Sequence, residues 1–172
     1  MILDLNPVAG YPEPYGTLLA TLSRQTSSWQ HQLEEPAPEE IVWQPAPGKH
    51  SIGGLMLHLA EVETHWIETV CCGREMTEAQ RDTFLSAHTD PFEGIWPTPP
   101  SEPLSYYYAI LNDVRSRTLQ RVRYFGDPTE TRECEWATVT LRWVLAHLIW
   151  HESYHGGQMV LLRELRRNLR EE

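Results

Sequence analysis

The chain has 172 residues, 41% of them hydrophobic, and its 14 basic and 24 acidic side chains give a formal charge of −10. This length suits one domain with a single core, no apolar run is long enough to span a membrane, and the acidic excess argues against nucleic acid as a partner, because phosphates must be neutralised by basic groups. The start of the chain lacks the basic and apolar regions of a signal peptide, so a cytoplasmic location is expected.

The first predicted helix covers residues 14–33. Its apolar residues, among them Leu18, Leu22 and Trp29, recur at the three- and four-residue steps of a helix. The following segment, residues 35–50, contains four prolines and a glycine and is predicted to be a loop.

The second predicted helix covers residues 52–70, and Ser51 precedes it as the expected N-cap. Its buried stripe is expected to include Leu55. Residues 74–102 are polar and rich in proline, around a possible short helix at 77–87. They are predicted to form a long crossover to the next helix.

The third and fourth helices are predicted over residues 102–125 and 140–168, separated by the helix-ending sequence Gly126–Asp127–Pro128. The alternating residues 132–138 could form a short extended piece, but no strand pattern is strong enough to predict a sheet. The expected fold is therefore all-α, a four-helix bundle with one long connection, and residues 1–172 are expected to form one domain.

Three histidines recur at steps of four in the fourth predicted helix: His147, His151 and His155. Side chains four residues apart lie on nearly the same helix face, so a neighbouring pair can bind one metal ion. His147 and His155 are two turns apart, about 12 Å, which is too far for one ion to reach both easily. A further ligand must come from another helix.

His58 on the second predicted helix is the candidate for that ligand, because it lies beside the apolar stripe. Each part of this site has a structural alternative. A lone histidine beside an apolar stripe is usually a packed side chain, and a helix with several histidines produces such pairs by chance. Glu61, three residues after His58, is the candidate to orient a ligand or act as a base, with a surface ion pair as the alternative.

The segments SIGGLMLHLAEVE and LRWVLAHLIWHESYHGGQMVLLRELR resemble the DinB/YfiT-like superfamily of metal-binding four-helix bundles. The lead-in VWQPAPGKHSIGGL is similar to the W-x-P-x-P-G loop of that family. The resemblance implies an up-down-down-up bundle with metal ligands at His58, His151 and His155. His147 matches no ligand position of the family and is expected to pack beside the site.

The resemblance also implies a divalent metal cofactor, a homodimer and, for some members, transfer of a low-molecular-weight thiol such as bacillithiol or mycothiol. Three neutral imidazoles leave an open coordination position, which is the pattern of catalytic sites. The expected ion is Zn or Ni, with Fe or Cu as alternatives.

Three functions remain open at this point. A metal-dependent transferase or hydrolase would activate a thiol or water at the three histidines. A non-catalytic, stress-related protein would bind the metal or a small ligand without turnover. An interaction domain would need no chemistry.

Overall fold

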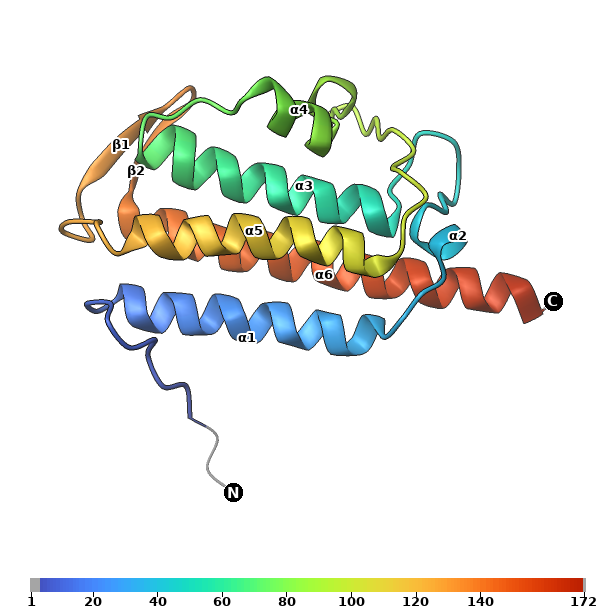
Figure 1. Ribbon diagram of the computed structural model, residues 1–172, viewed down its shortest axis with the longest axis horizontal. Helices are drawn as coiled ribbons and strands as arrows, with labels where there is room; N and C mark the ends of the chain where they lie inside the picture. The colour runs from blue at the N-terminus through green and yellow to red at the C-terminus, as the bar shows by residue number, and fades with distance from the viewer. Residues whose placement is uncertain (1–3, 172) are drawn as a thin grey trace.

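The computed structural model describes residues 4–171 and is mostly helical (Figure 1). None of the helices in this range is long and apolar enough to cross a membrane. In chain order the elements are α1 (Tyr15–Leu33), α2 (Pro38–Ile41), α3 (Ile52–Thr64), the π-helical segment η1 (His65–Cys71), α4 (Glu78–Phe84), the 3₁₀ turn η2 (Ser86–His88), α5 (Leu104–Val122), β1 (Thr131–Cys134), β2 (Ala137–Thr140) and α6 (Leu141–Glu171).

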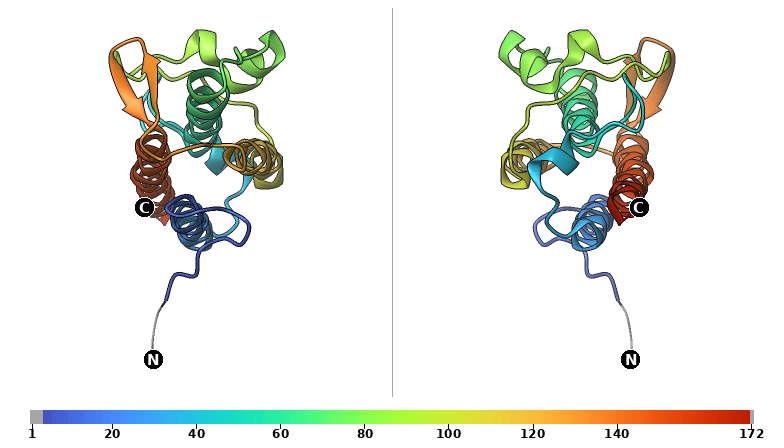
Figure 2. Two further views of the ribbon diagram at one scale, coloured as in Figure 1. Left: turned by 90° about the vertical axis from the view of Figure 1, so that its left-hand side faces the viewer. Right: turned by 90° about the vertical axis from the view of Figure 1, so that its right-hand side faces the viewer.

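Four long helices, α1, α3, α5 and α6, lie side by side (Figures 1 and 2). In Figure 1, α1 and α6 run in one direction, and α3 and α5 run in the other. The contacts are most extensive between α1 and α6, and α3 packs against both α5 and α6. The histidine-bearing helices α3 and α6 are therefore neighbours although they are far apart in the sequence.

Two glycines allow the helices to approach closely. A Cβ atom at Gly156 of α6 would lie 2.9 Å from the Trp29 side chain of α1. A Cβ atom at Gly53 of α3 would lie 2.7 Å from the Tyr107 hydroxyl of α5. These distances are shorter than van der Waals contact, so a larger residue at either glycine would push a pair of helices apart.

A buried ion pair network connects the four long helices. The guanidinium of Arg115 on α5 donates to the Glu63 carboxylate of α3 at 2.8 and 3.0 Å, and to Glu152 Oε2 of α6 at 2.8 Å. Glu152 Oε1 also accepts from the Thr26 hydroxyl at 2.5 Å and from Trp29 Nε1 at 2.8 Å, both on α1. Burial opposes the charge of Arg115, but the two carboxylates outweigh this effect and raise its pKa.

The sequence-based expectation of an all-α chain requires a correction, because β1 and β2 form a two-stranded antiparallel sheet. Cys134 pairs with Ala137, so the two strands meet across a two-residue turn. Four-residue strands carry little hydrophobic alternation, and this pattern was too short to predict pairing. The hairpin lies at the N-terminal end of α6, beside η1.

The predicted helices differ from the observed ones mainly at their ends. Ser51 is confirmed as an N-cap, because its hydroxyl accepts from Gly54 N at 3.1 Å. The loop predicted at 35–50 includes the single helical turn α2. The third predicted helix, 102–125, is shorter in the structure, at Leu104–Val122.

Replacing Arg115 by alanine is expected to lower the free energy of unfolding by about 3–5 kcal/mol, because it leaves two buried carboxylates without their counter-charge. Urea denaturation measures the change. Arg167→Ala is the matched control, since Arg167 is half exposed and faces the exposed Glu34 carboxylate at 3.6 Å. That change should cost at most about 1 kcal/mol, and equal losses in the two variants would show that removing Arg115 leaves no buried carboxylate unpaired.

Candidate metal centre

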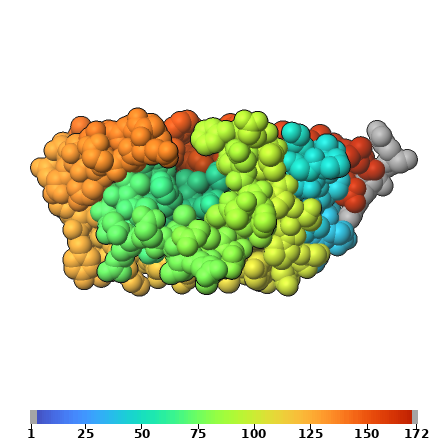
Figure 3. Space-filling model, turned by 90° about the horizontal axis from the view of Figure 1, so that it is seen from above, coloured from blue at the N-terminus to red at the C-terminus, as the bar shows by residue number. Residues whose placement is uncertain are grey.

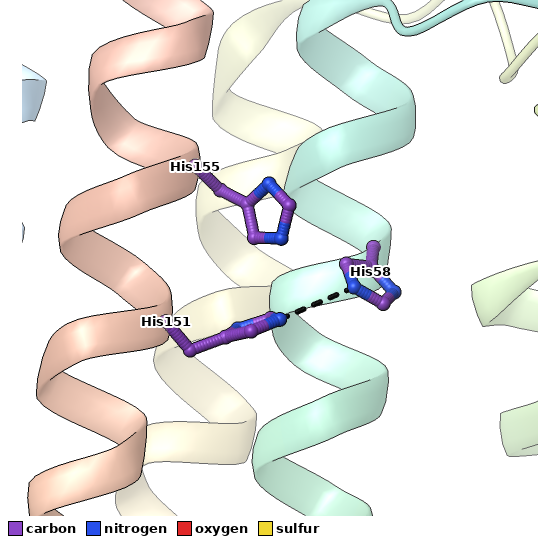
Figure 4. Close-up of side chains that lie close together, drawn as sticks. All are labelled: His58, His151 and His155. Carbon is purple, nitrogen blue, oxygen red and sulfur yellow. Dashed lines mark hydrogen bonds between the residues drawn. The ribbon is translucent and has the colours of Figure 1, made fainter. Parts of the chain in front are cut away.

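The three histidines singled out in the sequence lie together between α3 and α6 (Figure 4). His58 projects from α3, and His151 and His155 project from successive turns of α6. One ring nitrogen from each histidine can be chosen so that all three lie within 4.8 Å of one another. His58 and His155 are buried, and His151 is partly exposed. This arrangement supplies three imidazole donors around one point.

Two of the donors already have the spacing that a shared ion requires. His151 Nε2 lies 3.2 Å from His58 Nε2. In a tetrahedral site with metal–nitrogen bonds of about 2.0–2.1 Å, neighbouring ligand nitrogens are about 3.4 Å apart. The donor types and the spacing of this pair therefore fit a divalent ion of the size of zinc.

Gln158 fixes which nitrogen of His155 is free to bind a ligand. His155 Nδ1 lies 2.6 Å from Gln158 Oε1, and an amide oxygen is only an acceptor, so Nδ1 carries the proton and donates. The Nε2 atom of His155 is then left with a lone pair, as metal ligation needs. Sequence analysis assigned no role to Gln158. Its position three residues after His155 was the available signal, since such residues lie on the same helix face.

Burial keeps His151 and His155 neutral at physiological pH. Burial, together with the neighbouring imidazoles of His155, His58 and His147, lowers the pKa of His151 to about 2. It lowers the pKa of His155 to about 4, again with help from His58. A metal ligand must be deprotonated, so these imidazoles need not lose a proton to bind an ion near pH 7.

Glu61 lies beside His58, where it was expected to act. Its Oε2 atom is 3.7 Å from His58 Nδ1, which is within ion pair range but longer than a hydrogen bond. The buried Nδ1 atom has no hydrogen bond partner among the described residues. The Glu61 carboxylate therefore faces the nitrogen of His58 that points away from His151.

His147 lies next to the three-histidine group but is not part of it. Its ring stacks on Trp143 with a centroid distance of 4.9 Å and an interplanar angle of 10°. The His147 and His151 rings are 5.6 Å apart. This placement agrees with the packing position that the sequence indicated for His147.

Glu152 faces away from the histidines, as its position next to His151 in the helix indicates. Its carboxylate enters the network with Arg115 and Trp29 described above. Arg115 and Glu63 were missed by sequence analysis, because arginine–glutamate pairs between helices have no characteristic spacing. They hold α6 in place on the side opposite its histidines.

The surface above these helices is hollowed. Figure 3 shows a depression bordered by the β1–β2 hairpin and by the segment between α4 and α5, with α3 and α6 at its floor. The two helices at this floor are those that carry the three histidines. A small molecule can thus approach these helices from solvent.

Comparisons with known proteins point to one family. Residues 17–167 match a family model described as mycothiol-S-transferase. The chain also resembles the crystal structure of a conserved protein from Enterococcus faecalis, with a TM-score of 0.66 and 20% identity over 86% of this chain and 94% of that one. At this identity the likeness concerns the fold alone. No curated protein matches the chain.

Replacing His151 by alanine should abolish metal binding, because two imidazoles bind a divalent ion far more weakly than three. The metal content of the purified protein, measured by elemental analysis, is expected to fall from about one ion per chain in the parent to near zero in the variant. His147→Ala is the matched control from the same row and should retain the ion. Retention of about one ion per chain by His151→Ala would refute this ligand assignment.

The metal-free protein is expected to lose stability as the pH falls from about 6.5 to about 4. In this window the unfolded chain protonates His151 and His155, whose ordinary pKa is 6.5, while burial keeps the folded rings neutral. Acidification therefore favours unfolding, by at most about 1.4 kcal/mol per pH unit for each histidine.

Urea denaturation in the presence of a chelator measures this dependence. His151→Gln should show a shallower loss of stability than the parent protein, because it removes one of the two groups. An identical pH dependence in both proteins would show that His151 is not desolvated in the folded state.

Proposed function

Because the chain belongs to the mycothiol-S-transferase family of the DinB/YfiT-like superfamily, we propose that it is a metal-dependent thiol S-transferase. The observation that carries the proposal is the convergence of His58, His151 and His155 in a chain whose residues 17–167 match that family. The proposed substrates are a low-molecular-weight thiol, mycothiol by the family description, and a small electrophile.

The three imidazoles have the properties that this reaction requires of a binding site. They are uncharged ligands, so they would leave a divalent ion its full charge and room for a further ligand. An ion held by these residues would lower the pKa of a thiol bound to it and so favour the nucleophilic thiolate. The sulfur forms a bond to the electrophilic carbon, the leaving group departs with its electron pair, and the thiol proton passes to solvent.

Glu61 is proposed to position His58 rather than to contact the substrates. Its carboxylate lies 3.7 Å from His58 Nδ1, and a small rotation would let it accept a hydrogen bond from that atom. A carboxylate partner of this kind orients a ligating imidazole and makes it a stronger donor. Gln158 serves His155 in the same way through Nδ1.

Two alternatives use the same residues, namely a hydrolase that activates water and a protein that binds metal or a small ligand without turnover. The family match favours thiol transfer over both. We further propose Zn or Ni as the ion, with Fe or Cu as alternatives, because three imidazoles suit all four.

The same family relationship supports three structural proposals. We propose that α1, α3, α5 and α6 form the up-down-down-up bundle typical of the superfamily, which the helix directions in Figure 1 support. Residues 1–172 are proposed to form a single domain. The functional unit is proposed to be a homodimer, which sedimentation equilibrium would test.

The metal-loaded protein is expected to transfer mycothiol to an electrophile such as chloroacetone, with product measured by mass spectrometry. His155→Ala should lose this activity, because it removes one of the three donors, while His147→Ala should keep it. Metal bound at one ion per chain without any turnover across a panel of thiols and electrophiles would favour the non-catalytic alternative. Hydrolysis without thiol transfer would favour the hydrolase.

Glu61→Gln separates a positioning role from that of a base in the same assay. As a partner of His58, Glu61 should strengthen metal binding about 10–100-fold. Excess metal should then restore turnover in the variant. Full metal occupancy combined with lost turnover would instead identify Glu61 as a base.

A further inference from the structure

A cluster of tryptophans lies between the hairpin and the metal centre and has no part in the chemistry described above. Trp66 of η1, Trp136 of the hairpin turn and Trp143 of α6 contact one another edge to face, with centroid distances of 5.3 to 6.3 Å. Trp66 is buried and supports the other two, whereas 69% of Trp136 is exposed. An exposed indole at the tip of a hairpin contributes little to the core, so its large apolar surface is available to a ligand.

The surface at these rings is shaped for a small molecule. Trp136 and Trp143, together with β2, line a cavity of about 280 Å³. A cavity of this size suits a ligand of one or two rings and is too small for a helix. The tryptophans are therefore expected to contact a small molecule rather than a protein segment.

The chemistry of the cavity selects an apolar ligand. None of its lining residues is charged, although the chain carries a formal charge of −10. The hydroxyls of its two threonines already have partners, since Thr138 donates to Glu133 at 2.9 Å and Thr140 accepts from Trp143 N at 3.3 Å. Two indoles remain as the main contact surface, and indoles bind flat aromatic groups by stacking or edge contacts.

The tryptophan cluster is continuous with the metal centre. Trp143, His147 and His151 follow one another at four-residue steps on α6, and successive ring centroids are 4.9 and 5.6 Å apart. Trp143 and His151 are therefore about 12 Å apart along the helix. A ligand with an aromatic group at one end and a reactive carbon at the other can occupy both places.

We infer that Trp136 and Trp143 form the subsite for the aromatic group of an elongated aryl electrophile whose reactive carbon meets the thiol at the three histidines. This inference rests on the proposed transferase function and names the class of its second substrate. In the test reaction the mycothiol sulfur bonds to the CH₂ carbon of a chloromethyl ketone. The carbon–chlorine bond breaks, chloride leaves with the electron pair, and the thiol proton passes to the buffer.

Binding is tested first, with 2-naphthol as an unreactive aromatic probe and isothermal titration calorimetry of the metal-loaded protein. Trp136→Ala should weaken binding about tenfold, because it removes one of the two stacking surfaces. This change should not affect folding, since Trp136 is largely exposed. Trp150→Ala is the matched control, because 65% of Trp150 is exposed but it does not line the cavity, and it should bind the probe as the parent does.

Turnover is tested with mycothiol and two ketones, 4-(2-naphthyl)phenyl chloromethyl ketone, whose phenyl spacer lets the naphthyl ring lie at the tryptophans while the CH₂ carbon reaches the histidines, and chloroacetone. Trp136→Ala should raise KM for the naphthyl ketone about tenfold and leave kcat unchanged. The same variant should leave both constants for chloroacetone unchanged, because that ketone has no aromatic group.

The outcomes separate the subsite from the transferase. Probe binding that depends on Trp136 without turnover of either ketone would support the subsite and refute the transferase. Turnover of both ketones with unchanged KM in Trp136→Ala would refute the subsite alone. Equal probe binding by Trp136→Ala and the parent would also refute it. Sedimentation equilibrium gives a last test. If the parent is a dimer that binds no probe and Trp136→Ala dissociates it, the surface is an interface between two copies, and the subsite is refuted.

Discussion

The helices that carry the histidines, α3 and α6, are joined by the guanidinium of Arg115, which lies on the side of α6 opposite its histidines. Arg115 reaches from α5 to Glu63 on α3 and Glu152 on α6. Glu152 directly follows His151, and Glu63 is five residues after His58, so the ion pairs set the spacing and rotation of the two helices that face each other at the site. A buried ion pair adds little net stability but strongly disfavours arrangements that leave a charge unpaired. In this chain an arrangement that separated Arg115 from Glu63 and Glu152 would leave buried charges unpaired.

The same packing desolvates the three imidazoles, which is unfavourable for the free rings, but it also leaves their lone pairs able to bind a cation. Burial lowers the pKa of His151 to about 2 and that of His155 to about 4, so both rings stay neutral with lone pairs available. Without an ion, the Nε2 atoms of His58 and His151 lie 3.2 Å apart and can form a single hydrogen bond, in which one ring donates and the other accepts. A divalent ion would bond to every donor and offset their desolvation. The electrostatics of this cluster thus favour a cation over the free rings.

The face of α6 that carries the histidines continues into aromatic side chains. The row from His151 through His147 to Trp143 leads to the hairpin, whose turn presents Trp136. A polar reaction centre next to an uncharged aromatic surface suits a substrate that combines a reactive carbon with an apolar group. The hairpin is small, but under the proposed function it would supply the part of the surface that distinguishes one electrophile from another.

Periodicity and proline positions were sufficient to predict the helical class and the long helices, because these depend on contacts within one helix. Histidine spacing indicated only that a neighbouring pair could share an ion, and the family resemblance singled out His151 and His155. Local sequence could suggest His58 but could not bring it to α6, since that requires the packing of two helices distant in the chain. The Arg115 network and the exposure of Trp136 were decided by tertiary structure alone, because the contacts involved join residues far apart in the sequence. The alternation at residues 132–138 suggested an extended piece, but strands this short could not predict the β1–β2 pairing.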